Sequence, residues 1–185
     1  MNDYYIVENI NDIDLQMLLN DYIENFTKKK LIINTTYEKL KTIEVRFNKR
    51  DIFHLLGLHK VQDFNNNATK ALQNIVEGKL TINKIKKHHN FGEMRNRLLN
   101  YNFLHKCFLD KEIHLCIIPL ENRKNPQKLS VVFIDYLNNT NMLLGLKLDH
   151  SKRYFVPATM YQINDSSIYK RIKRTSITNI TWETY

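Results

Sequence analysis

Glycine, proline and cysteine are scarce in this sequence, and their scarcity excludes several classes of site. The 185 residues include four glycines, three prolines and two cysteines. The cysteines, Cys107 and Cys116, have neither the spacing of a zinc site nor that of a disulfide framework. The sequence contains no glycine-rich phosphate loop and no serine nucleophile elbow. We therefore expect a protein that uses no metal or other cofactor and works in a reducing compartment.

Long hydrophobic runs are also missing. No window approaches the ~20 apolar residues of a membrane-spanning helix. The N-terminal residues lack the basic and apolar regions of a secretory signal. These absences predict a cytoplasmic protein that has no membrane among its partners.

Positive charge is abundant and unevenly distributed. The sequence has 28 Lys and Arg against 19 Asp and Glu, which gives a formal net charge of +9. Residues 1–27 hold six acidic residues and no Lys or Arg, whereas basic residues gather at 79–87 and at 147–174. Such an excess favours a polyanionic partner, because each cation placed on a phosphate releases counterions. The acidic start is either an exposed helix or a segment that shields a basic groove.

The apolar periodicity changes along the chain from helical to strand-like. Helical spacing begins at about 12–27 and gives its longest predicted helix at 94–109, and alternation dominates from residue 113 onwards. Helices first and strands second predict a single α+β domain over residues 1–185. Its expected architecture is a helical N-terminal half packed on an antiparallel β-meander. Two shorter β-like stretches lie earlier, at 31–35 and 42–47.

The densest cluster of candidate catalytic groups lies between Phe53 and Lys60. His54 and His59 are five residues apart, so on a regular helix their side chains differ in direction by about 140°. A bend at Gly57 would let both imidazoles point into one cleft. Two imidazoles supply a general base and a general acid near neutral pH, and a nearby cation stabilises phosphorane charge. The alternative is a helix with one buried and one exposed histidine.

A second cluster occupies the predicted strand 153–161. Arg153 is a candidate phosphate ligand, and Tyr154 and Tyr161 are candidates for stacking on bases. Pro157 interrupts the alternation of this strand. An ordinary edge strand is the alternative interpretation.

The third cluster is a run of four cations, namely Lys170, Arg171, Lys173 and Arg174. In a chain of this net charge the run predicts a track for RNA phosphates. If the following strand, 172–182, pairs with the strand at 153–161, these cations face the cleft that holds His54. A solvated face or a surface for an acidic inhibitor is the alternative.

The segment from Phe53 to Lys60 resembles one found in phage members of the barnase–EndoU–colicin–RelE-like nucleases, whose pattern is Phe-x-His-Leu-x-Gly-Leu-x-Lys. In this chain Phe53 directly precedes His54. The segment Tyr154–Thr159 is similar to a later aromatic-Pro-Ser/Thr segment of the same family. The resemblance implies metal-independent RNA cleavage, often by a toxin or anti-phage effector with an inhibitor partner. It also implies that His54, Lys60 and Thr159 lie near the active site, in a nuclease-like core at 41–182 that follows an acidic helix and strand extension at 1–40.

These features together predict a metal-independent endoribonuclease that cleaves RNA by attack of the 2′-hydroxyl. Its expected partners are RNA and an antitoxin or inhibitor, made of protein or RNA. Two alternatives remain open: a non-catalytic module that binds RNA or an inhibitor, and a phage accessory protein that acts through its basic face. The candidate catalytic residues are His54, His59, Lys60, Tyr154 and Thr159. The candidate RNA-binding residues are Arg153, Lys170, Arg171, Lys173 and Arg174.

Overall fold

The computed structural model describes residues 4–61, 67–120 and 125–185. Its strands are β1 (Lys29–Thr35), β2 (Thr42–Arg46), β3 (Leu115–Ile117), β4 (Val131–Leu137), β5 (Thr140–Asp149), β6 (Tyr154–Gln162) and β7 (Arg174–Thr184). Its α-helices are α1 (Leu15–Tyr22), α2 (Asp51–Leu55), α3 (Ala68–Val76), α4 (Ile82–Lys86), α5 (Phe91–Leu99) and α6 (Phe103–Phe108). Shorter helical turns are η1 (Ile23–Thr27), η2 (Glu38–Leu40), η3 (Leu58–Lys60) and η5 (Ile168–Arg171). No helix within these ranges is long and apolar enough to span a membrane.

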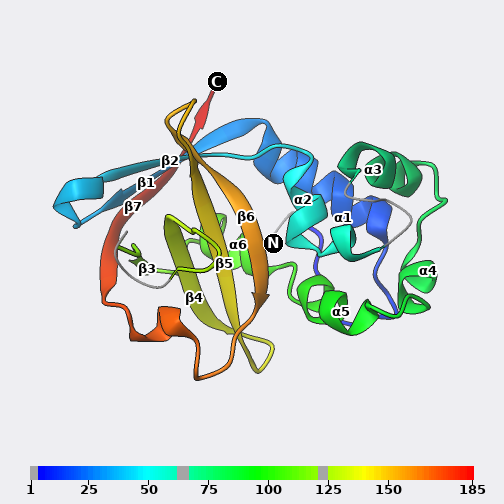
Figure 1. Ribbon diagram of the computed structural model, residues 1–185. Helices are drawn as coiled ribbons and strands as arrows, with labels where there is room; N and C mark the ends of the chain where they lie inside the picture. Colours follow the sequence, from blue (N-terminus) through cyan, green and yellow to red (C-terminus); the bar gives the residue numbers. More distant parts are fainter. Residues whose placement is uncertain (1–3, 62–66, 121–124) are drawn as a thin grey trace.

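The described strands close into a seven-stranded barrel. Their order around the barrel is β1-β2-β6-β5-β4-β3-β7. Neighbouring strands are antiparallel except β2 and β6, which are parallel and meet at Val45 and Phe155. Figure 1 shows the barrel on one side of the molecule and α2, α3, α4 and α5 gathered on the other. These four helices are therefore grouped beside the barrel, next to β6.

The predicted packing of a helical N-terminal half on an antiparallel meander is therefore wrong. The two early strands, β1 and β2, belong to the barrel, and β1 closes it by pairing with β7 from the other end of the chain. Alternation identifies a strand but not its partner, and sequential strands are neighbours only about two-thirds of the time. The division into an extension at 1–40 and a core at 41–182 stays a prediction. Residues from both parts contribute to one hydrophobic core.

The longest predicted helix, 94–109, is two helices. The break follows Leu99, where the buried side chain of Asn100 turns back and donates a hydrogen bond to the Asn96 carbonyl at 2.8 Å. Asparagine side chains that bond to nearby backbone compete with helix continuation in this way. The chain starts again as α6, whose side chains are buried except for Lys106 and pack on the inside of the barrel.

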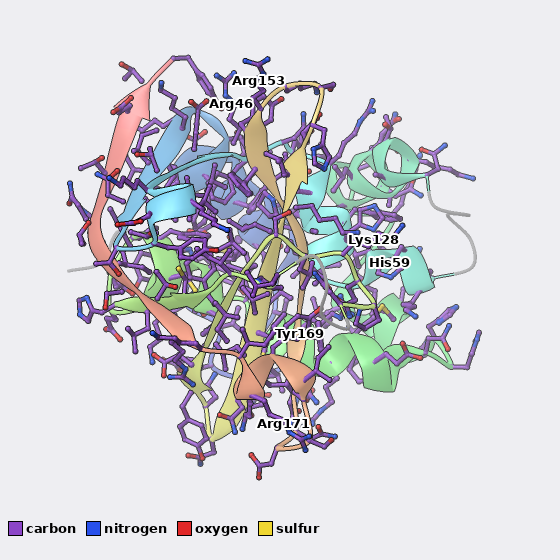
Figure 2. The ribbon with its side chains drawn as sticks, turned by 60° about the vertical axis from the view of Figure 1, so that its left-hand side comes forward. Arg46, His59, Lys128, Arg153, Tyr169 and Arg171 are labelled. Carbon is purple, nitrogen blue, oxygen red and sulfur yellow. The ribbon has the colours of Figure 1, made fainter. Side chains whose placement is uncertain are left out.

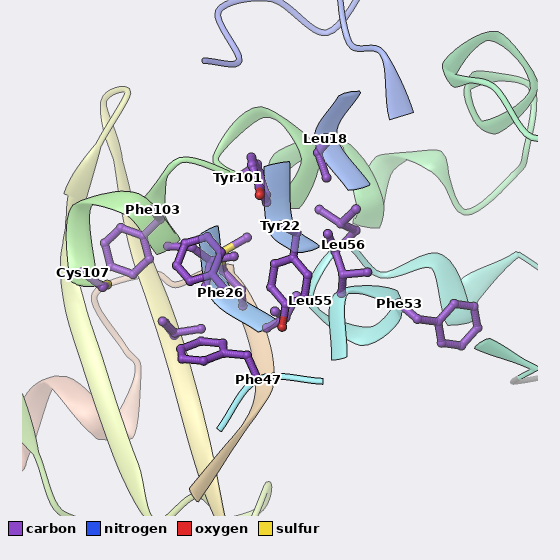
Figure 3. Packing of buried hydrophobic residues seen from close by; sticks show 14 of the residues in the cluster. Leu18, Tyr22, Phe26, Phe47, Phe53, Leu55, Leu56, Tyr101, Phe103 and Cys107 are labelled. Carbon is purple, nitrogen blue, oxygen red and sulfur yellow. The ribbon is translucent and has the colours of Figure 1, made fainter. Parts of the chain in front are cut away.

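One hydrophobic core joins the barrel to the helices. Figure 3 shows Tyr22 near its centre, with Phe26 and Phe47 on the barrel side and Leu55 and Leu56 on the helical side. All five side chains are buried, and the Tyr22 and Phe26 ring centres lie 5.5 Å apart. This packing holds α2 in a fixed position against the barrel, which matters because α2 carries a candidate catalytic histidine.

Strand β4 is covered on both faces. Val131 and Phe133 belong to the main core, whereas Val132 and Ile134 pack in a second cluster under Tyr169. A strand that is buried on both sides reads as a continuous apolar run, as this one does in the sequence. The C-terminal segment around η5 thus covers the outside of the barrel at this point.

A buried carboxylate ties the N-terminal segment to α1 and α6. Asp21 Oδ2 accepts hydrogen bonds from the Tyr101 hydroxyl at 2.5 Å and from His105 Nε2 at 2.8 Å. Its Oδ1 accepts the backbone N–H of Tyr5 at 2.7 Å. Asn102 Nδ2 donates to His105 Nδ1, so the ring proton is assigned to Nε2, facing the carboxylate. Burial alone would raise the pKa of Asp21, but the hydrogen bonds from His105 and Tyr101 outweigh it and lower the pKa.

Replacing this carboxylate should destabilise the protein strongly. In Asp21→Ala, the buried donors of Tyr101 and His105 lose their acceptor, and breaking a buried pair of this kind costs about 3–5 kcal/mol. Urea denaturation measures the free energy of unfolding. The control is Glu8→Ala, which removes an exposed acid next to the same segment and should change stability by less than about 0.5 kcal/mol. Equal stability of the two variants would show that the network does not hold the segment.

Candidate active site

The two histidines of the Phe53–Lys60 segment meet at a turn formed by glycine. Helix α2 ends at Leu55, and Gly57 takes a left-handed conformation with φ of 76° before η3 begins. The turn brings the rings of His54 and His59 to 5.1 Å between their centres. The bend at Gly57 thus brings the two imidazoles together, and their facing a common cleft stays a prediction.

An arginine from α5 lies across this turn. A Cβ at Gly57 would come within 3.0 Å of Arg97 Cδ, so both the space and the positive φ require glycine here. Arg97 Nη1 donates a hydrogen bond to the His54 carbonyl oxygen at 3.0 Å. This bond and the close packing link α5 to the end of α2. They place a guanidinium beside the two imidazoles.

The outer face of β6 forms the floor beneath these helices. The Arg97 guanidinium lies 5.9 Å from the centre of the Tyr161 ring. Thr159 lies two residues earlier on the same strand, so its side chain lies on the same face as Tyr161. A β-bulge opposite Gly145 and Leu146 leaves Ala158 as an extra residue in β6. Without this extra residue, alternation from the buried Phe155 and Pro157 would turn Thr159 to the inner face.

The electrostatic surroundings of the histidines are positive. Burial first, then the charges of Arg97 and Lys147, lower the pKa of His54 below its ordinary value of 6.5. Burial, followed by the charges of His54, Arg97 and Lys60, lowers the pKa of His59 to about 4. Both rings are therefore neutral at neutral pH in the free protein. A site of this kind attracts an anion, because its cations have few acidic partners.

One nitrogen of the second histidine is held away from solvent. His59 Nδ1 is buried and has no hydrogen bond of good geometry within the described residues. The Phe53 backbone carbonyl is close enough to raise the pKa slightly against the other effects. Buried polar nitrogens are rarely left in this state. Because this nitrogen is closed off from solvent, a substrate would have to meet the ring at its other nitrogen, Nε2.

Lys60 closes the other side of the cluster. Its Nζ lies 3.1 Å from Glu93 Oε2, in a pair that is more than one-third exposed on both sides. Such a pair contributes little stability and can open to a phosphate. Next to it is an open pocket of about 390 Å³ between α5 and the end of β6. It is lined by Gly92, Glu93, Asn96, Arg97, Tyr161, Gln162, Ile163 and Asn164.

The structure does not bring Tyr154 and Arg153 to the histidines. Tyr154 begins β6, about 16 Å along the strand from Thr159 at the usual rise per residue. The Arg46 guanidinium covers the Tyr154 ring at 4.6 Å. Figure 2 shows Arg46 and Arg153 together at one end of the barrel, away from His59. A role of Tyr154 and Arg153 in substrate binding stays a prediction.

The C-terminal cationic run lies elsewhere again. The predicted pairing of its strand with the strand at 153–161 is wrong, because β6 lies between β2 and β5 whereas β7 lies between β1 and β3. Closing the barrel separates the two strands. Figure 2 shows Arg171 at the end of the barrel opposite Arg153. Lys170 Nζ contacts Asp165 at 2.6 Å. The four cations therefore form a separate basic surface, and RNA binding by it stays a prediction.

Two residues of the site were absent from the candidates in the sequence. Arg97 lies inside the predicted long helix, and no local pattern connects it to Gly57. In the sequence Lys147 belongs to a basic block, and it directly follows the apolar run that ends at Leu146. That position at the end of a predicted strand is the signal that the sequence offers. In the part of the chain that the structure describes, no three His, Cys, Asp or Glu side chains gather as a metal site.

Comparison with known proteins identifies the family of this chain. A family model described as phage-Barnase-EndoU-ColicinE5/D-RelE like nuclease4 matches residues 14–185. That range includes the histidine segment, Arg97 and all of the barrel strands. A search of curated proteins and a search of solved structures each gave no match. The resemblance seen in Phe53–Lys60 is confirmed, and the chain belongs to this family of phage-type barnase–EndoU–colicin–RelE-like nucleases.

Proposed function

We propose that this nuclease is a metal-independent endoribonuclease whose catalytic pair is His54 and His59. The observation that supports the proposal best is the 5.1 Å separation of two neutral imidazoles beside Arg97. Two such groups are what cleavage by an internal nucleophile requires, because RNA supplies that nucleophile as its own 2′-hydroxyl. Lys60 and Lys147 add positive charge next to the pair.

The reaction follows from these groups. One imidazole accepts the proton of the 2′-hydroxyl as its oxygen forms a bond to phosphorus. The bond from phosphorus to the 5′-oxygen breaks, and the other ring, then protonated, gives that oxygen a proton. The products are a 2′,3′-cyclic phosphate and a 5′-hydroxyl. Arg97 and Lys60 stabilise the charge that develops on the phosphorane oxygens, and Thr159 and Tyr161 orient the substrate.

The biological role proposed for this activity is that of a cytoplasmic toxin or anti-phage effector. A nuclease that needs no cofactor acts wherever it meets RNA, so the producing cell requires an antitoxin or inhibitor. The net charge of +9 favours an acidic partner as well as RNA. The surface cations Arg153, Lys170, Arg171, Lys173 and Arg174 are proposed to bind RNA phosphates away from the cleaved bond. A non-catalytic RNA-binding module would keep the binding and lack the cleavage.

Removing the first histidine should abolish most of the cleavage. His54→Ala is expected to lower kcat by ~100-fold or more, the usual loss when general acid–base help disappears. The assay follows a labelled RNA oligonucleotide, with a DNA of the same sequence that should stay intact because it lacks the 2′-hydroxyl. His114→Ala removes another exposed histidine, outside the site, and should cleave like the wild type. Cleavage by His54→Ala at the wild-type rate would reject the assignment.

The pH dependence of cleavage should report the lowered pKa values. A base acts in its neutral form, and a lowered pKa keeps the ring neutral to lower pH. The acidic limb of kcat/KM should therefore lie below pH 6.5. Lys147→Gln removes a charge that lowers the pKa of His54, so the limb should move up towards 6.5 if His54 is the base.

Asp51 has a pKa raised by burial to about 7 and titrates in a similar range, so the comparison between variants matters more than the wild-type profile alone. The control is Lys41→Gln, which removes an exposed lysine at the β1–β2 connection and should leave the profile unchanged. An identical profile for Lys147→Gln and wild type would count against His54 as the base.

Chelation should leave the activity intact. The proposed mechanism assigns proton transfer to imidazoles and charge stabilisation to Arg97 and Lys60, and it routes no step through a divalent ion. Cleavage is therefore expected to have the same rate in excess EDTA as in buffer with Mg²⁺. A rate that falls in EDTA and returns with Mg²⁺ or Mn²⁺ would overturn the mechanism.

A further inference from the structure

A second basic pocket lies between α3 and α4, outside the proposed catalytic pair. Its volume is about 390 Å³. The residues that line it combine lysines on the rim with an apolar floor, and they are Val61, Lys70, Asn74, Lys79, Leu80, Lys84, Ile85, Lys87 and His88. Val61, Leu80 and Ile85 are buried, whereas the four lysines are exposed. The pocket is therefore a fixed hollow surrounded by mobile positive charges.

Among the residues that the structure describes, the lysines of this pocket have few acidic partners. Lys79 pairs with Glu77 at 2.5 Å. Lys84 Nζ donates to the backbone carbonyl of Lys79 instead of to an acid. Within the described residues, no acidic side chain pairs with Lys70 or Lys87. Like charges around a hollow focus a positive potential, and an anion seated there relieves their repulsion.

The pocket adjoins the candidate active site. Val61, on its wall, follows Lys60 directly, so their Cα atoms are about 3.8 Å apart. Asn90 Nδ2 donates to the Lys60 carbonyl at 3.0 Å, which ties the segment after α4 to η3. A bound nucleic-acid chain that runs from the histidines past Lys60 would therefore reach this pocket next.

We propose that the lysine pocket between α3 and α4 binds the phosphate backbone of a nucleic-acid strand beyond the bond that is cleaved. The inference rests on the proposed function for the identity of the strand as RNA. Lysine presents a compact point charge without the planar fork of arginine, and phosphate contacts position a strand without reading its bases. The pocket thus extends the binding surface and adds affinity for longer substrates, independently of sequence.

The test compares RNA of two lengths on a protein that cannot cut it. In the His54→Ala background, Lys84→Glu/Lys87→Glu is measured against Lys39→Glu/Lys41→Glu, an equal charge change at the exposed β1–β2 connection. Fluorescence anisotropy gives the affinity for oligonucleotides of about 4 and about 16 nucleotides, lengths that bracket usual single-strand sites. The neutral pair Lys84→Gln/Lys87→Gln serves if charge reversal impairs folding.

The pocket variant should bind the long RNA about tenfold more weakly than the control does, and the short RNA equally well. For the long RNA, the slope of the logarithm of affinity against the logarithm of salt concentration should become shallower by about 1.4, which is about 0.7 for each of two lost phosphate contacts. Equal affinity of the two variants for the long RNA would overturn the pocket proposal. The catalytic proposal is tested separately, because it fails if the wild-type protein, with His54 intact, does not cleave RNA. An effect on an acidic inhibitor alone, with RNA binding unchanged, would assign the pocket to that partner and overturn the inference.

Discussion

Gly57 holds a backbone conformation with positive φ, and Arg97 lies across it. This contact determines the geometry of the candidate site. A side chain at Gly57 would strain the turn and displace the arginine, and the turn is what directs His59 back towards His54. The hydrogen bond from Arg97 to the His54 carbonyl joins α5 to α2, and the same guanidinium lies over Tyr161 of β6. This contact thus links both imidazoles, a neighbouring cation and the strand below them.

In the proposed mechanism, the same contact connects substrate binding to proton transfer. Arg97 and its neighbouring lysines attract phosphate, but in the free protein they also lower the pKa of both histidines. A phosphate bound between them offsets that positive charge and raises the pKa of the ring beside it. In the proposed mechanism, binding therefore favours one protonated and one neutral imidazole, which is the combination that the cleavage step needs.

The sequence predicted the local features of the site and missed its assembly. The segment Phe53–Lys60 gave the histidines, the glycine bend and the nuclease family, because each depends on residues close together in the chain. The barrel was not predictable in this way, since β1 pairs with β7 and β2 runs parallel to β6. Arg97 reaches Gly57 only in the folded chain. Tyr154 lies about 16 Å along β6 from Thr159, where Arg46 covers its ring.

The central claim is that two imidazoles cleave RNA through its own 2′-hydroxyl. That chemistry leaves a signature on the ends of the products, whatever the sequence cut. Mass spectrometry of the fragments from a defined RNA, analysed early in the reaction, identifies those ends directly. The account predicts a 2′,3′-cyclic phosphate on one fragment and a 5′-hydroxyl on the other. Fragments that carry a 3′-hydroxyl and a 5′-phosphate would show attack by water instead and would contradict it.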